Sequence, residues 1–135
     1  ESCTGGMIAA AMTDRAGSSA VFDRGVVTYS NAAKIEQLGV SAAILDTHGA
    51  VSAETAAAMV EGTLSHSAAQ IALSVTGIAG PSGGSAEKPV GLVYIGCGVK
   101  GGKVDTFEHR FSGDRAAIRH QSVEAALRHA LDALA

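Results

Sequence analysis

The sequence has no tryptophan, only two cysteines and two prolines, and few aromatic or charged side chains. Cys3 and Cys97 lie far apart and form no CxxC motif, so we expect neither a disulfide framework nor a zinc site. Aromatic residues make up 4% of the chain and no Lys/Arg cluster occurs, which disfavours nucleic-acid binding. The apolar runs are short and interrupted, so we expect no membrane span and no membrane partner.

What the chain does contain is enough apolar material for one folded domain. It has 135 residues, of which 47% are hydrophobic, so we expect a single domain over 1–135 with its own core. Two unpaired cysteines fit a reducing cytoplasm, and no secretory signal is visible. The sequence begins at Glu1 without methionine, so we expect its natural amino terminus to lie upstream.

Hydrophobic periodicity and turn residues predict alternating helices and strands. We expect helices over 6–13, 32–38, 53–64 and 114–134, and strands over 21–29, 71–76, 90–99 and 103–111. Lys100-Gly101-Gly102 is typical of a hairpin turn between the last two strands. The alternation predicts an α/β layered sheet of mixed strand order, with ligand sites on the loops at the strand ends.

Ser2 is the first candidate for chemistry, because it comes just before a pair of glycines and the first predicted helix. One interpretation is structural: its hydroxyl caps the helix. The other is a nucleophile beside free amides of Thr4, Gly5 and Gly6 that stabilise an oxyanion. Cys3 is a competing nucleophile without an evident partner, or else a small buried hydrophobic residue.

A serine nucleophile needs a base, and Lys34 is the best candidate. None of the five histidines lies in a motif that marks it as a base. Lys34 lies early in a predicted helix, where the helix dipole and burial lower the pKa of an amine, as a Ser-Lys pair requires. The alternative is a solvated lysine. Tyr29, at the predicted end of a strand, is either a proton relay or orienting group, or an ordinary strand-end tyrosine.

Two loops are candidates for ligand binding. The glycine-rich segment 76–84 matches neither the P-loop nor the Rossmann pattern, but it can expose amides to a phosphate or a flat ring. The alternative is a flexible loop. Arg115 opens the last helix after a capping Ser112 or Asp114, and a cation at that end suggests a bound anion such as a phosphate. No metal-ligand spacing appears, so we expect no metal and no cofactor.

Several motifs are spread over the whole chain: ESCTGG (1–6), DRAGSS (14–19), GVVTYSNAAK (25–34), LGV (38–40), HGAVS (48–52), TGIAGPSGG (76–84), KPVG (88–91) and FSGDR (111–115). In this order and spacing, they together resemble the CinA C-terminal domain family. Family members carry a helix and a strand before the ESCTGG motif, and we expect both to precede the printed sequence.

The resemblance implies a three-layer α/β/α fold with a mixed, mostly parallel sheet, similar to an anticodon-binding domain. It implies hydrolysis of the amide of nicotinamide mononucleotide, which gives nicotinic acid mononucleotide and ammonia in pyridine-nucleotide salvage. It also implies a small-molecule nucleotide substrate, a homodimer and a cytoplasmic location.

The resemblance assigns roles to matching positions. The family's catalytic serine, tyrosine and lysine fall on Ser2, Tyr29 and Lys34. We expect the substrate to contact Ser30, Asn31, Thr76, Gly77, Gly80, Gly83, Gly84 and Arg115. The alternative function is a non-catalytic nucleotide-binding or regulatory module linked to competence or DNA damage. Such a module has no need to keep Ser2, Tyr29 and Lys34 together, which favours the enzyme.

Overall fold

The computed structural model describes all of residues 1–135. The helices lie close to the predicted ranges, but α3 and a short 3₁₀ helix, η1, were not predicted. None of the helices combines the length and apolar character that crossing a membrane requires. The elements are α1 (Met7–Thr13), η1 (Ser18–Ala20), α2 (Asn31–Leu38), α3 (Ala42–His48), α4 (Ala53–Ser65), β1 (Ile71–Gly77), β2 (Leu92–Val99), β3 (Val104–Arg110) and α5 (Arg115–Leu134).

The sheet has three strands in the order β1-β2-β3, and both pairs are antiparallel. The prediction of a mixed, mostly parallel sheet is therefore wrong. Parallel neighbours need a long crossover, usually a helix. Here β1 reaches β2 through the loop 78–91, and a short turn joins β2 to β3, so no helix separates consecutive strands.

The predicted strand over 21–29 is not a strand. Three residues that suggested it are exposed: Val21, Val27 and Tyr29 are 80%, 45% and 61% exposed. The segment instead bonds to Glu1, whose carbonyl accepts from the Thr28 amide at 2.9 Å. The Ser2 amide in turn donates to Val75 of β1 at 2.9 Å. The first residues of the chain therefore lie between this segment and β1.

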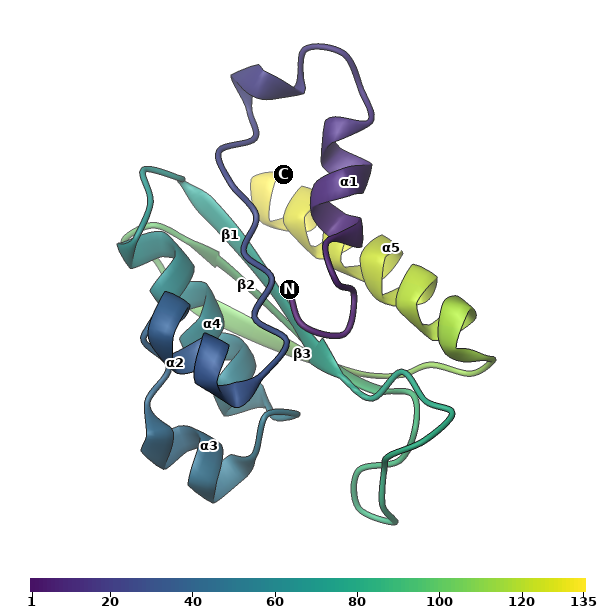
Figure 1. Cartoon of the computed structure of the whole chain (residues 1–135). Coiled ribbons are helices and arrows are strands. Elements are labelled where there is room, and N and C mark those ends of the chain that lie inside the picture. The colour runs from purple at the N-terminus through teal and green to yellow at the C-terminus, as the bar shows by residue number, and fades with distance from the viewer.

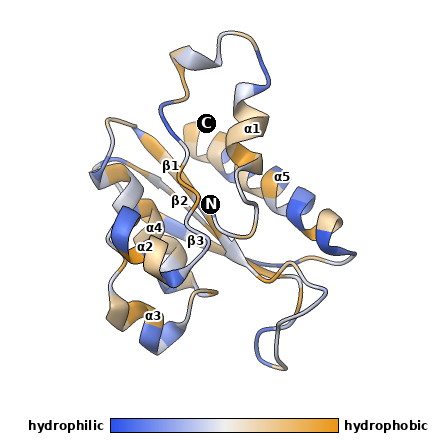
Figure 2. Ribbon diagram, in the orientation of Figure 1, coloured by the Kyte–Doolittle hydropathy of each residue, from blue (hydrophilic) through white to orange (hydrophobic).

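Helices cover both faces of the sheet (Figure 1). On one face Val60 and Leu64 of α4 pack against Ala72 of β1, and α2 and α3 pack on α4. On the other face α5 closes a larger core, and α1 packs against α5. Hydrophobic residues, orange in Figure 2, run along β1 in the middle of the molecule. The larger core contains Cys3, Ile8, Val75, Ala79, Val93, Ile95, Ile118 and Ala126.

Gly62 allows α2 and α4 to approach closely. A Cβ atom at this position would lie 2.0 Å from the carbonyl oxygen of Leu38, the last residue of α2. Only a residue without a side chain fits there. This contact fixes α2, the helix that carries Lys34, against α4.

A histidine pair holds the last turns of α5 on β3. The Nε2 atoms of His109 and His129 lie 3.0 Å apart, and Phe107 stacks on His129 with ring centroids 3.6 Å apart. Burial lowers the pKa of both imidazoles. A neutral pair can share one proton in a hydrogen bond. These histidines belong to the packing of α5 and not to the pocket described next.

Candidate active site

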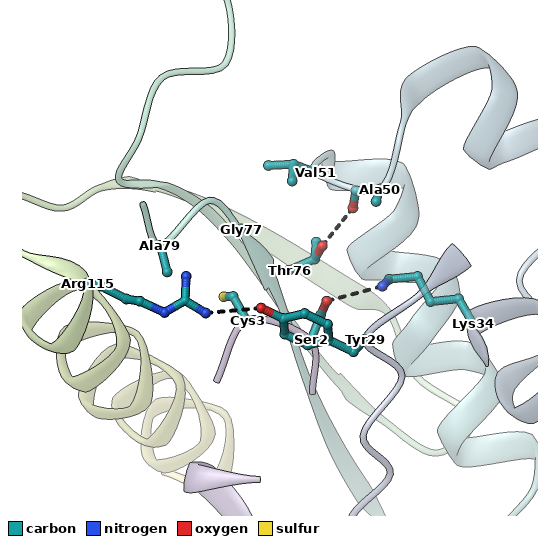
Figure 3. Close-up of a pocket in the computed structure, with 10 residues that line it drawn as sticks. All are labelled: Ser2, Cys3, Tyr29, Lys34, Ala50, Val51, Thr76, Gly77, Ala79 and Arg115. Carbon is teal, nitrogen blue, oxygen red and sulfur yellow. Dashed lines mark hydrogen bonds between the residues drawn. The ribbon is translucent and has the colours of Figure 1, made fainter. Parts of the chain in front are cut away.

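A pocket of about 210 Å³ opens where the end of β1, the segment before α2 and the first turn of α5 meet. It gathers residues from segments far apart in the sequence (Figure 3). Six of the residues proposed from the sequence as catalytic or substrate-binding are among them: Ser2, Tyr29, Lys34, Thr76, Gly77 and Arg115. The full lining is Ser2, Cys3, Tyr29, Lys34, Ala50, Val51, Thr76, Gly77, Ala79 and Arg115.

Lys34 and Ser2 form a buried polar pair at the centre of this site. The Lys34 Nζ donates to the Ser2 Oγ at 3.1 Å and to the Thr28 carbonyl at 2.7 Å. Lys34 is only 1% exposed, so it is not a solvated surface lysine. Burial lowers the pKa of its amine, and a weaker attraction to the Cys3 sulfur opposes this. Burial therefore favours the neutral amine, the form that can take a proton from serine.

The Glu1 carboxylate, and not the Ser2 hydroxyl, accepts from the amides at the start of α1, so the interpretation of Ser2 as a helix cap is wrong. One Glu1 oxygen accepts from the Thr4 hydroxyl at 2.6 Å and from the amides of Gly6 and Ile8, both at 3.1 Å. The other accepts from the Ala9 amide at 2.9 Å. Burial opposes ionisation of Glu1, but these hydrogen bonds outweigh it and lower the pKa. The hydroxyl of Ser2 thus stays free to face Lys34.

Glu1 was not predicted as a site residue from the sequence, although a signal was present. A carboxylate a few residues before a helix start can complement the unpaired amides and the positive end of the helix dipole. The ESCTGG motif begins with such a residue.

The backbone amides around Ser2 divide into bonded and free groups. The Gly5 amide donates to the Ser2 carbonyl at 3.0 Å, and the Gly6 amide donates to Glu1. The amides of Cys3 and Thr4 donate to no acceptor in the chain. Of the three predicted oxyanion donors, only the Thr4 amide lacks an acceptor, and the Cys3 amide, which was not predicted, lacks one too. Cys3 lines the pocket, whereas Thr4, Gly5 and Gly6 lie outside its lining. Gly5 and Gly6, at φ +57° and +101°, supply the turn instead.

Cys3 lines the pocket as a buried thiol and is 4% exposed. Burial raises the pKa of this thiol to about 11. The reactive form of cysteine is the thiolate, which is scarce at neutral pH when the pKa is this high. Cys3 therefore fits a wall of the pocket better than a nucleophile.

Arg115 and Tyr29 meet at the rim of the pocket. The guanidinium of Arg115 donates to the Tyr29 hydroxyl at 3.1 Å and to the Gly80 carbonyl at 2.8 Å. The partners of the Lys34 amine are Ser2 and Thr28, so Tyr29 does not contact it. The geometry does not support the proton relay suggested from the sequence. It places Tyr29 beside the cation of Arg115.

Of the other residues predicted to contact the substrate, some line the pocket and some do not. Thr76 lines the pocket, and its hydroxyl donates to the Ala50 carbonyl at 2.7 Å. Gly77 also lines it. The remaining predicted contacts lie outside the lining: Ser30, Asn31, Gly80, Gly83 and Gly84. Ser30 instead caps α2, since its hydroxyl accepts from the Ala33 amide at 3.0 Å.

Ala50, Val51 and Ala79 line the pocket but were not proposed from the sequence. The only signal for the first two was their place in the HGAVS motif, to which no chemistry was attached. No three His, Cys, Asp or Glu side chains gather at a point where they would hold a metal ion.

A profile of the CinA C-terminal domain matches residues 1–134. This protein belongs to the CinA C-terminal domain family. It is 58% identical to a protein named nicotinamide-nucleotide amidohydrolase PncC from Enterobacter agglomerans, over 97% of this chain and 80% of that protein. It is also 58% identical to a putative competence-damage inducible protein from Caldicellulosiruptor bescii, where the match covers 94% of this chain.

The fold of this CinA-family domain also matches solved structures. A competence/damage inducible protein from Agrobacterium tumefaciens superposes with a TM-score of 0.95 at 52% identity, over 97% of this chain and 80% of that one. The chain covers 80% of the length of the PncC relative but only 31% of the length of the Caldicellulosiruptor protein.

Proposed function

We propose that this protein hydrolyses the carboxamide of nicotinamide mononucleotide to nicotinic acid mononucleotide and ammonia. The observation that carries the proposal is the buried Ser2–Lys34 pair, with two free amides beside it. A relative at 58% identity is named for this activity. Hydrolysis of an unactivated amide needs an activated nucleophile, and a serine with a desolvated lysine is one way to supply it.

In the proposed first half-reaction, neutral Lys34 removes the proton of the Ser2 hydroxyl while Oγ attacks the carboxamide carbon. The carbonyl π electrons move to oxygen, and the resulting oxyanion accepts from the amides of Cys3 and Thr4. The intermediate then collapses. The C–N bond breaks, the leaving nitrogen takes the proton from Lys34, and ammonia departs from an ester on Ser2.

The second half-reaction reverses the proton path. Water gives a proton to Lys34 as its oxygen attacks the ester carbon, and the same two amides hold the second oxyanion. The C–Oγ bond breaks, Ser2 recovers its proton from Lys34, and the product leaves as a carboxylic acid that ionises. The Thr28 carbonyl, 2.7 Å from Nζ, keeps the amine in place for both transfers.

Arg115 is the proposed partner of the substrate phosphate. Apart from Lys34, it is the only cationic side chain that lines the pocket. Its guanidinium can form paired hydrogen bonds with phosphate oxygens, and Tyr29 and the Gly80 carbonyl hold it at the rim. Thr76 and the loop 77–84 are the proposed contacts for the rest of the nucleotide.

The family resemblance also supports two wider proposals. We propose that the protein acts as a homodimer and in the cytoplasm. Leu131 and Leu134 near the end of α5 are 68% and 67% exposed, which is compatible with further burial in an assembly. Light scattering on the purified protein measures its molar mass and so tests the homodimer.

The test of the function is product analysis with three substrates. We expect nicotinamide mononucleotide to give equal amounts of ammonia and nicotinic acid mononucleotide. Nicotinamide riboside, which lacks the phosphate, should have kcat/KM lower by at least about 100-fold, since charge-assisted bonds contribute about 1.5–3 kcal/mol each. Nicotinamide should react more slowly still. Binding of the nucleotide without any turnover would instead favour the non-catalytic module.

A further inference from the structure

We propose that Arg119 is a positioning residue that sets the direction of an oxyanion-hole amide. The inference rests on the proposed amidase function and concerns a side chain that does not line the pocket. Arg119 lies on α5, four residues and so about one turn after Arg115.

Arg119 holds two consecutive carbonyl groups of the turn that follows Ser2. Its Nε donates to the Cys3 carbonyl at 3.0 Å, and its Nη2 donates to the Thr4 carbonyl at 3.2 Å. A guanidinium presents its N–H groups in a rigid plane, so it fixes two acceptors at once. These two bonds link the helix α5 to residues more than a hundred positions earlier in the chain.

The direction of the Thr4 amide follows from peptide geometry. In a planar trans peptide, the carbonyl of one residue points opposite to the N–H of the next. The bond from Arg119 to the Cys3 carbonyl therefore turns the Thr4 N–H away from Arg119. The neighbouring peptide is fixed in the same way, because the Gly5 amide holds the Ser2 carbonyl and so orients the Cys3 N–H.

These two peptides carry the two amides of the turn that have no acceptor. Free, rigidly held N–H groups next to a nucleophile are what oxyanion stabilisation requires, because they need no reorganisation when charge develops. The turn is shaped to admit the guanidinium: a Cβ atom at Gly5 would lie 3.3 Å from the Arg119 Nη2. Without Arg119, the peptide between Cys3 and Thr4 can rotate.

A merely structural role for Arg119 predicts different behaviour. It would join the amino-terminal turn to α5, and its loss would lower the melting temperature without a selective effect on turnover. The positioning role predicts a loss in kcat at nearly constant KM, because the amide interacts mainly with the charged transition state.

The experiment compares Arg119→Met and Arg119→Lys with the control Arg128→Met. Arg128 lies on the same helix and pairs only with the exposed Glu124. We expect Arg119→Met to lower kcat for nicotinamide mononucleotide by about 100-fold, the scale of one lost oxyanion donor, with KM within about twofold. Arg119→Lys should recover part of the rate, and Arg128→Met should behave as wild type.

A second measurement does not depend on the natural substrate. A fluorophosphonate probe reacts with an activated serine: the Oγ–P bond forms, the P–F bond breaks, and the serine proton passes to the base. We expect Ser2 labelling, followed by intact mass, to slow by at least about tenfold in Arg119→Met. If wild type labels but releases no ammonia, the amidase function fails while this comparison still tests Arg119.

Either of two results would overturn the inference. One is Arg119→Met with kcat and labelling rate within about threefold of wild type, whatever its melting temperature. The other is a wild-type protein whose Ser2 neither labels nor turns over substrate, since the turn would then serve no nucleophile.

Discussion

Replacing Lys34 by methionine is expected to lower kcat by at least about 1,000-fold while leaving the protein folded. Methionine fills a similar volume but cannot accept the proton of Ser2, 3.1 Å away. The side chain is 1% exposed and the pKa of its amine is lowered by burial, so removing the amine also removes a cost of desolvation. We therefore expect activity to be lost with no fall in melting temperature.

Steady-state ammonia release and a thermal melt measure both parts of this prediction. Lys34→Arg is the matched variant, because arginine has a long side chain with N–H donors but does not deprotonate in proteins and so cannot act as the base. It should be as inactive as Lys34→Met. A Lys34→Met protein with more than a tenth of wild-type kcat would contradict the role of this amine as base.

The pH dependence of the wild type follows from the same group. A lysine acts as a base only when neutral, so kcat/KM should rise with pH as the ammonium loses its proton. Burial lowers this pKa, so the rise should end below the 10.5 of an ordinary lysine. A profile that rises only above that value would place the base elsewhere.

Replacing Gly62 by alanine is expected to destabilise the domain by about 3 kcal/mol, or about 10 °C in melting temperature. Helix propensity alone favours alanine by about 1 kcal/mol. The added Cβ, however, would lie 2.0 Å from the Leu38 carbonyl oxygen and 2.9 Å from its carbon, both backbone atoms. The two helices must therefore separate, and α2 carries Lys34 away from Ser2.

Denaturant unfolding measures the effect, and Glu61→Ala is the control. Glu61 is the preceding residue of α4 and is exposed, so its replacement should change the free energy of unfolding by no more than about 0.5 kcal/mol. A Gly62→Ala protein as stable as wild type would show that α2 has room to move without cost.

The helices were predictable because their local signals agree with their packing. Asp114, one of the two proposed caps of the last helix, accepts from the Ala117 amide three residues later. The conformation of the segment 21–29 was not predictable, because Val21 and Val27 are exposed and the segment bonds to Glu1 and not to another strand. Strand order depends on which segments meet in space, and composition does not determine that.

In the candidate site, too, single residues were predictable from the sequence, whereas their contacts were not. The motifs indicated Ser2, Lys34, Thr76 and Arg115 individually, and the structure brings them to one pocket. Which amides stay free was not predictable, because it depends on how Glu1 and Gly5 bond within the folded turn. The partner of Tyr29 was also beyond reach, since Arg115 is 86 residues away in the chain.

The most direct test of the account is ammonia release from nicotinamide mononucleotide by wild type, Ser2→Ala and Cys3→Ala. The account predicts turnover in wild type and a loss of at least about 1,000-fold in Ser2→Ala, with nucleotide binding retained. Cys3→Ala should stay within about tenfold of wild type, since its thiol has a pKa of about 11. Turnover that survives in Ser2→Ala, or that disappears only with Cys3, would contradict the central claim that Ser2 is the nucleophile.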